Sequence, residues 1–252
     1  MTASVTLANV TRPELDALES RVRASSQRAQ CLEEAAQTFT REMFESFAGS
    51  TALARVYATV PYARLPTAAR AFVAELVASK GHQLHDATPV LSLVGSYGLL
   101  PEWCDRKLSQ GHVGIPLLDA RFVGAIPMVA RLLQELGIDL RWFDDAPGAY
   151  VRRLIGGFNG VFYVEDASAS RDQHGRFVVP AQDFVAKHGI KTVFGMGGHY
   201  LDGTLVAAIV FARESLPRSQ AETFASLISG FKTSTASFVR AGSIFAEPLE
   251  AV

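Results

Sequence analysis

Apolar residues recur at alternating steps of three and four along the first part of the chain, from Leu15 to Met43. A repeat of 3.5 residues is typical of a helix that packs lengthwise against another helix. Pro13 stands where the first turn would be, a position that suits proline. We therefore predict one continuous helix over residues 13–47, preceded by a tail over residues 1–12. We call the positions of this repeat the heptad seam. They are Leu15, Leu18, Val22, Ser25, Ala29, Leu32, Ala36, Phe39 and Met43.

Shorter apolar runs, each bounded by glycine or proline, follow this helix. Runs of strand length that are rich in Val, Ile and Phe predict strands. Longer runs with apolar residues on one side predict helices. The predicted strands cover residues 53–60, 89–96, 160–165, 191–196 and 204–213. The predicted helices cover residues 66–78, 122–136, about 180–189 and 217–239.

The clearest local signal is a pair of apolar runs separated by a glycine-rich segment, residues 197–203. Two strand-like runs joined in this way indicate an antiparallel hairpin. A proline-started helix follows it, and its apolar stripe is Phe224, Leu227, Ile228, Phe231 and Phe238.

Length and composition narrow the class of protein. The 252 residues are 48% hydrophobic and carry a net charge of −1, so we expect a globular chain without affinity for nucleic acid or anionic membranes. No apolar run approaches membrane-spanning length, and the N-terminus lacks the pattern of a signal peptide. Two cysteines cannot form a disulfide framework. We expect a soluble, cytoplasmic α+β protein with one domain over residues 48–240 and a tail over residues 241–252.

The predicted order of elements, together with the hairpin that ends in Val-Ala-Ala-Ile-Val-Phe-Ala-Arg at residues 206–213, resembles the GAF branch of the PAS/GAF sensory folds. In that family a central antiparallel sheet carries the terminal helices on one face. Loops and short helices close over a small-molecule pocket on the other face. The resemblance implies a small-molecule-binding sensory domain in signal transduction, without catalytic output of its own.

The segment Trp-Cys-Asp-Arg-Lys at residues 103–107 places several candidate site residues close together. Trp103 could stack on a flat ligand, and Arg106 could pair with an anionic group. Cations next to Cys104 could lower the pKa of its thiol, and His112 is close in sequence. A small enzyme that uses Cys104 and His112 in thiol or hydrolytic chemistry therefore stays open as an alternative, as does an inert cysteine.

The histidines allow a second alternative, a haem- or metal-binding sensor, because neutral imidazole is a common protein ligand. His82 and His85 form an H-x-x-H pair without paired cysteines, which is more typical of a solvated loop. His199 falls in the glycine-rich turn, where we expect it to be exposed. Ser96 lacks the glycine that a nucleophile elbow needs two residues earlier, which indicates a turn residue.

Aromatic residues of the predicted strands belong first to the core, and some of them should line the face of the sheet that holds a ligand. This aromatic set is Phe158, Phe162, Tyr163, Phe194, Tyr200 and Phe211. We expect no catalytic residue and predict a ligand-binding set of Trp103, Cys104, Arg106, His112, Phe162 and Phe194.

The expected partners are a small-molecule ligand and a second copy of the chain. The heptad seam requires a partner helix, which can come from a second subunit or from the same chain. We predict a homodimer through the Leu15–Met43 helix, the Phe224–Phe238 helix or both, and packing within the chain's own domain stays open as the alternative. A purely structural interaction module, without any pocket, is the remaining alternative.

Overall fold

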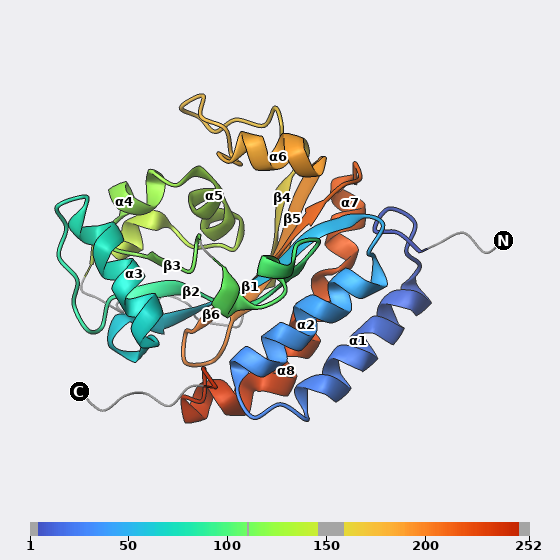
Figure 1. Ribbon diagram of the computed structural model, residues 1–252, viewed down its shortest axis with the longest axis horizontal. Helices are drawn as coiled ribbons and strands as arrows, with labels where there is room; N and C mark the ends of the chain where they lie inside the picture. Colours follow the sequence, from blue (N-terminus) through green and yellow to red (C-terminus); the bar gives the residue numbers. More distant parts are fainter. Residues whose placement is uncertain (1–4, 110, 146–158, 247–252) are drawn as a thin grey trace.

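A computed structural model describes residues 5–109, 111–145 and 159–246 and contains a single six-stranded antiparallel sheet. The spatial order of its strands is β3-β2-β1-β6-β5-β4, which places the first and the last strand in sequence, β1 and β6, side by side at the centre (Figure 1). The strands are β1 Thr51–Pro61, β2 Pro89–Gly98, β3 Gly114–Pro116, β4 Asn159–Val164, β5 Thr192–His199 and β6 Leu205–Ala212.

The helices divide between the two faces of this sheet. In Figure 1, α1, α2 and α8 lie together along one side of the sheet, and α5 packs on the other. The predicted α+β class, with an antiparallel sheet and terminal helices on one face, is confirmed. The helices are α1 Arg12–Ser26, α2 Leu32–Ser46, α3 Thr67–Ala78, α4 Ala120–Gly124, α5 Pro127–Glu135, α6 Gln182–His188, α7 Arg218–Thr223 and α8 Ala225–Ala241.

The central strand β1 separates two hydrophobic clusters because successive side chains of a strand point to opposite faces. Ala54 and Val56 belong to the cluster beneath α1, α2 and α8. Leu53 and Tyr57 belong to the cluster beneath α5 and α6. Both faces of the sheet are therefore covered, which agrees with the nearly continuous apolar sequence of its central strands.

The prediction of one continuous N-terminal helix is wrong, because residues 27–31 turn the chain back between α1 and α2. The side chains of Ser25 and Ser26 bond back to the carbonyl oxygen of Val22, as such residues do where a helix ends. The backbone N–H groups of Leu32 and Glu33 then donate to residues 243 and 244, so a distant segment satisfies the start of α2.

The heptad seam finds its partner within the same chain. Leu15, Leu18 and Val22 of α1 are buried with Phe39 and Met43 of α2 in the cluster that α8 and the sheet complete. The stripe of α8 is buried there as well, apart from the partly exposed Phe238. The seam predicted a helix partner correctly, and that partner lies within the same chain, where the seam residues are buried apart from the half-buried Ala29. The homodimer stays a prediction.

Both predicted tails pack on the domain where the structure describes them. Leu7 is buried, and its N–H donates to Ser50 Oγ over 3.1 Å. Ile244 is also buried, next to the start of α2. Residues 1–4 and 247–252 of these tails, and Phe158 of the aromatic set, lie outside the described residues.

Three further elements differ from the prediction: two helices are interrupted and one strand is additional. The helix expected over residues 122–136 is two helices, because Pro127 lacks the N–H that would continue the first of them. The C-terminal helix is interrupted at Phe224, whose buried ring packs edge-on against Phe47. The short edge strand β3 was not predicted. No helix among the described residues is both long and apolar enough to cross a membrane.

The predicted hairpin is confirmed as β5 and β6, but His199 is not an exposed turn residue. Strand β5 continues through the glycines to His199, and the turn begins only at Tyr200. His199 is 3% exposed. Burial, together with the positive charge of Lys232, lowers the pKa of its imidazole to about 4.

Close approach of α2 to the sheet depends on Gly95. The register of β1 and β2 shifts between Val56 and Tyr57, where β2 contains a bulge. A Cβ atom at Gly95 would lie 2.5 Å from the backbone carbonyl of Ala36 in α2. The helix therefore sits on the strand at a distance that only glycine allows.

We expect Gly95→Ala to lower the free energy of unfolding by about 1–3 kcal/mol, because α2 must move away from the sheet. Gly49→Ala is the matched control, since a Cβ there meets no atom within 4 Å. The control should stay within about 0.5 kcal/mol of the wild type. Urea denaturation of both variants measures the difference, and equal stabilities would contradict this account of the packing.

The lowered pKa of His199 predicts that the free energy of unfolding falls under mildly acidic conditions. Its pKa in the folded chain lies below the usual value of about 6.5 that applies after unfolding. The unfolded chain therefore binds a proton between pH 6.5 and about 4 that the folded chain does not bind, so stability falls as the pH falls through this window.

Relative to the variant His199→Gln, the wild type should lose about 2–3 kcal/mol of unfolding free energy between pH 7 and pH 4. The exposed turn residue His174 supplies the control His174→Gln. Denaturant titrations at several pH values measure the effect. Parallel pH profiles for the wild type and His199→Gln would contradict it.

Candidate ligand-binding site

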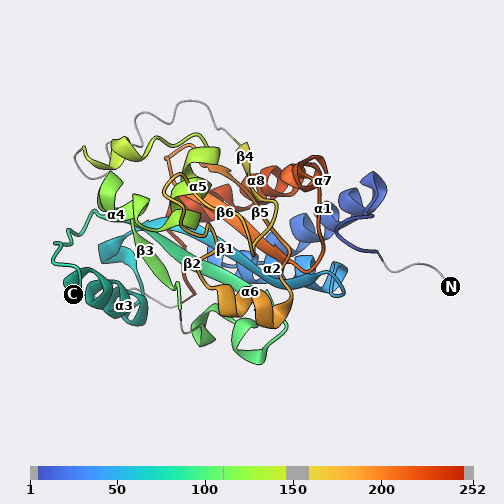
Figure 2. The ribbon, with the colours of Figure 1, turned by 90° about the horizontal axis from the view of Figure 1, so that it is seen from above.

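A cavity of about 490 Å³ lies over the face of the sheet opposite α1, α2 and α8. Its floor comes from β1 and β6, and its walls come from the segment after β2, from α5 and from α6. Figure 2 shows α6 beside the segment that follows β2. The lining residues are Leu53, Arg55, Tyr57, Trp103, His112, Met128, Val179, Pro180, Ala181, Phe184 and Phe211.

Aromatic rings form one continuous wall of this cavity. The rings of Trp103 and Phe184 meet at a centroid distance of 5.6 Å, and Phe184 meets Phe211 at 5.3 Å with perpendicular planes. Edge-to-face contacts of this kind hold rings in fixed orientations. Since the three rings belong to three different segments, this wall exists only in the folded chain.

The loop that carries Trp103 is held by β2 and α2. Ser96 is buried in β2, rather than lying in the predicted turn, and its hydroxyl donates to the carbonyl oxygen of Trp103 over 2.8 Å. The amide of Gln37 in α2 donates to the carbonyl oxygens of Ser96 and Cys104, over 2.7 and 2.8 Å. The position of Trp103 is thereby coupled to a helix on the other side of the sheet.

Arg55 is the unexpected member of the site. It is the single interior position of β1 that is not fully buried. Its guanidinium donates to Ser109 Oγ over 2.9 Å, and to Tyr57 Oη and the carbonyl oxygen of Gly111 over 3.3 Å each. Its Nε is buried and has no hydrogen-bond partner. Among the described residues no carboxylate pairs with Arg55.

His112 lines this cavity and also a neighbouring hollow of about 720 Å³ between α3 and α4. Its backbone has φ of 57°, in the left-handed region that non-glycine residues seldom adopt. Desolvation, followed by the positive charge of Arg55, lowers the pKa of its imidazole. His112 is therefore neutral near pH 7 and can both donate and accept a hydrogen bond.

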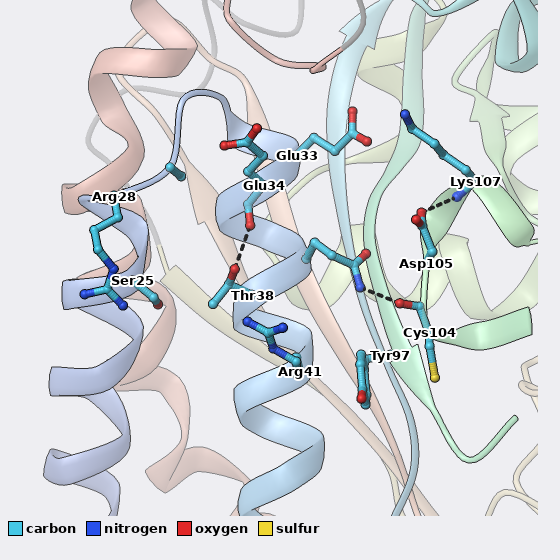
Figure 3. A pocket seen from close by; sticks show the side chains of 12 residues that line it. Ser25, Arg28, Glu33, Glu34, Thr38, Arg41, Tyr97, Cys104, Asp105 and Lys107 are labelled. Carbon is cyan, nitrogen blue, oxygen red and sulfur yellow. Dashed lines mark hydrogen bonds between the residues drawn. The ribbon is translucent and has the colours of Figure 1, made fainter. Parts of the chain in front are cut away.

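Cys104 lies in a different place from His112. It lines a polar hollow of about 540 Å³ between α2 and the end of β2, which Figure 3 shows with Glu34, Thr38 and Arg41 on its helical side. Its thiol donates to the carbonyl oxygens of Gly98 and Leu100, over 3.3 and 3.4 Å. The structure does not bring Cys104 and His112 into one hollow.

Arg106 is turned away from the cavity and is buried in an ion pair. Its guanidinium lies 2.7 Å from Glu33 Oε2, with the two side chains 6% and 9% exposed. The same carboxylate oxygen accepts the N–H of Ala246, and the ring of Phe245 lies 4.9 Å from the Arg106 guanidinium carbon. The pair joins the loop, the start of α2 and the C-terminal segment.

Phe162 and Phe194 do not line the cavity. Both are fully buried, but on opposite faces of the sheet. Phe162 belongs to the cluster beneath α5 and α6, whereas Phe194 packs against Phe224 below α8. Neighbouring strand residues that alternate in this way cannot share one pocket.

The described histidines do not assemble a metal centre. No group of three or more His, Cys, Asp or Glu side chains among the described residues has a geometry that could hold a metal ion. His82 lies 3.8 Å from a carboxylate oxygen of Asp119, and His85 lies in the loop after α3.

Solved structures that match the chain include GAF domains. The phycoerythrobilin-bound GAF domain of a cyanobacterial phytochrome is 13% identical, with a TM-score of 0.46, over 90% of this chain and 97% of that one. The GAF domain of an Acinetobacter phosphoenolpyruvate-protein phosphotransferase is 14% identical, with a TM-score of 0.46, over 93% and 100%. No family model matches the chain, and no curated protein matches it in sequence.

The sequence pointed to Trp103 and His112, which the structure places at one cavity, and missed most of the remaining lining. Arg55 left a signal, because a lone arginine interrupts the apolar run of residues 52–58. Phe184 and Met128 left none, since both read as ordinary positions on amphipathic helices.

Arg106→Ala should lower the free energy of unfolding by about 3–5 kcal/mol, because it leaves the buried Glu33 carboxylate without its counter-charge. Arg23→Ala is the matched control, since Arg23 pairs with Glu19 while its side chain is 57% exposed. That control should cost less than about 1 kcal/mol. Thermal and urea denaturation compare them, and a cost for Arg106→Ala no larger than the control would contradict a structural role.

Proposed function

We propose that this chain is a sensory domain that binds a small, largely apolar and partly planar molecule in the cavity over the sheet. The observation that carries the proposal is the cavity itself. Its volume falls within the range of about 300–1,000 Å³ that is typical of small-molecule sites. Its lining combines an aromatic wall with a few polar groups, which is also typical of such sites.

The proposed contacts differ in part from those predicted from the sequence. Trp103, Phe184 and Phe211 would contact the flat part of the ligand, and His112 would offer a polar anchor. Phe162 and Phe194 support the sheet from within the core, and Arg106 supports the loop from behind. These three residues are therefore left out of the proposed contacts, and so is Cys104.

Signal transfer would use the contacts that tie the Trp103 loop to the helices. A ligand shifts a conformational equilibrium only by binding two states with different affinity. A movement of Trp103 would be transmitted to α2 through Gln37, and to the C-terminal segment through the Arg106–Glu33 pair. The receiving partner would be a second copy or another protein, and would contact the exposed sides of α1 and α8.

An enzymatic role for Cys104 with His112 has less support. The two side chains line different hollows, and the thiol is engaged as a hydrogen-bond donor to two carbonyl oxygens. A reactive thiolate would need cations or N–H donors around the sulfur atom.

The neutral naphthalene dye Prodan tests the cavity, because its fluorescence shifts to the blue in apolar surroundings. We expect the wild type to bind the dye and the double variant Trp103→Ala/His112→Ala to bind it at least about tenfold more weakly. Loss of the Trp103 ring removes part of the aromatic wall, and each factor of ten corresponds to about 1.4 kcal/mol.

Trp142→Ala is the matched control, since Trp142 packs against the hydrophobic cluster beneath α5 and α6 but is not among the residues that line the cavity. It should bind the dye within about twofold of the wild type. Unchanged affinity in the double variant, or no binding by the wild type, would overturn the proposed site.

A further inference from the structure

We infer that the ligand of this cavity is a compact aromatic acid, a flat apolar body that carries one carboxylate, with Arg55 as its counter-charge. The inference rests on the proposed function and adds the chemical class of the ligand. It comes from the one charged side chain that the central strand β1 carries at the floor of the cavity.

The position of Arg55 is costly for a charge. Its neighbours in register are Ser96 of β2 and Ile209 of β6, and the nearest side chains on this face of β1, Leu53 and Tyr57, belong to a hydrophobic cluster. A charged group removed from water is destabilising unless it is paired and hydrogen-bonded. A strand interior would ordinarily carry an apolar residue here, so the charge calls for a partner.

The described part of the protein does not supply that partner. The three hydrogen bonds of Arg55 go to a serine hydroxyl, a tyrosine hydroxyl and a backbone carbonyl, all of them uncharged acceptors. These bonds hold the guanidinium in place but leave its charge uncompensated and its buried Nε without an acceptor. A carboxylate suits such a group, because its two oxygens accept from the planar guanidinium side by side.

The charges around the cavity favour a single negative charge on the ligand. Among the described lining residues Arg55 is the one lysine or arginine, and none of them is an aspartate or a glutamate. His112, neutral near pH 7, adds a hydrogen-bonding group without adding a charge. One cation without a cluster of backbone N–H donors suits a carboxylate better than a phosphate dianion.

The remaining lining defines the body of the ligand. Leu53, Met128 and Val179 supply aliphatic surface, and the wall of Trp103 and Phe184 supplies ring edges and faces. A flat ring fills such a space and stacks on it. The acid group at Arg55 and the ring at Trp103 would then occupy the floor and the wall of the same cavity.

The test compares an acid with its neutral amide. Isothermal titration of the full chain with 2-naphthoate and with 2-naphthamide holds the ring constant and changes the charge. We expect the wild type to bind the acid at least about tenfold more tightly than the amide. In Arg55→Met, which keeps the length of the side chain but not its charge, the acid and the amide should bind equally.

Two more variants complete the set. Arg55→Lys should retain part of the preference, because a charge remains but the planar fork is lost. Arg41→Met removes an exposed arginine of α2 outside this cavity and should leave the preference unchanged. Circular dichroism verifies that each variant is folded, and the wild-type comparison stands even if Arg55→Met does not fold.

The outcomes separate this inference from the proposed function. If Prodan binds but the wild type shows no preference for the acid, or binds neither naphthalene compound, the inference is wrong and the cavity keeps its role. A preference that persists in folded Arg55→Met, or that disappears in Arg41→Met, also overturns the role of Arg55. If the wild type does not bind Prodan, the proposed function fails and the inference fails with it.

Discussion

The burial of β1 on both faces is the constraint on which the rest of this structure depends. Its neighbours in the sheet are β2 and β6, so the strand has no free edge, and its side chains alternate between two hydrophobic clusters. One cluster is closed by α1, α2 and α8. The other is closed by shorter elements, which leave a cavity above Arg55. The same strand therefore lies at the centre of the sheet and forms part of the floor of the cavity.

The two faces of the sheet are coupled through the segment that follows β2. This segment leaves the sheet after Gly98, shortly beyond the point where α2 approaches Gly95 closely, and then presents Trp103 to the cavity. Behind Trp103, Gln37 and Glu33 of α2 hold the backbone of Cys104 and the side chain of Arg106. Arg106, which the sequence suggested as a ligand contact, therefore stabilises the loop from within the fold. The carboxylate of its partner Glu33 also accepts a hydrogen bond from the C-terminal segment.

Two residues of the site adopt states that cost free energy locally. Arg55 keeps a charge where the surrounding strand is apolar, and His112 keeps a left-handed backbone without being glycine. Such local costs persist only where the surrounding structure enforces them, and they often accompany binding sites. Both residues line the same cavity, where desolvation and then the positive charge of Arg55 lower the pKa of His112.

The sequence by itself determined the α+β class and most of the elements. Apolar periodicity located five of the six described strands, the glycine-rich hairpin and most of the amphipathic helices, because these patterns follow from local geometry. It could not determine that the heptad seam folds back on itself, since a 3.5-residue repeat asks for a partner helix without specifying which one. The turn at residues 27–31 depends on hydrogen bonds from a segment two hundred residues away.

Tertiary structure alone decided which polar residues meet. Trp103 and Arg106 are three residues apart, yet one lines the cavity and the other is buried in an ion pair on the opposite side of the loop. Phe162 and Phe194 both lie in strands and face opposite sides of the sheet. Residue type indicates what a side chain can do, but its neighbours depend on strand register and on packing across the chain. These long-range contacts are absent from any local pattern.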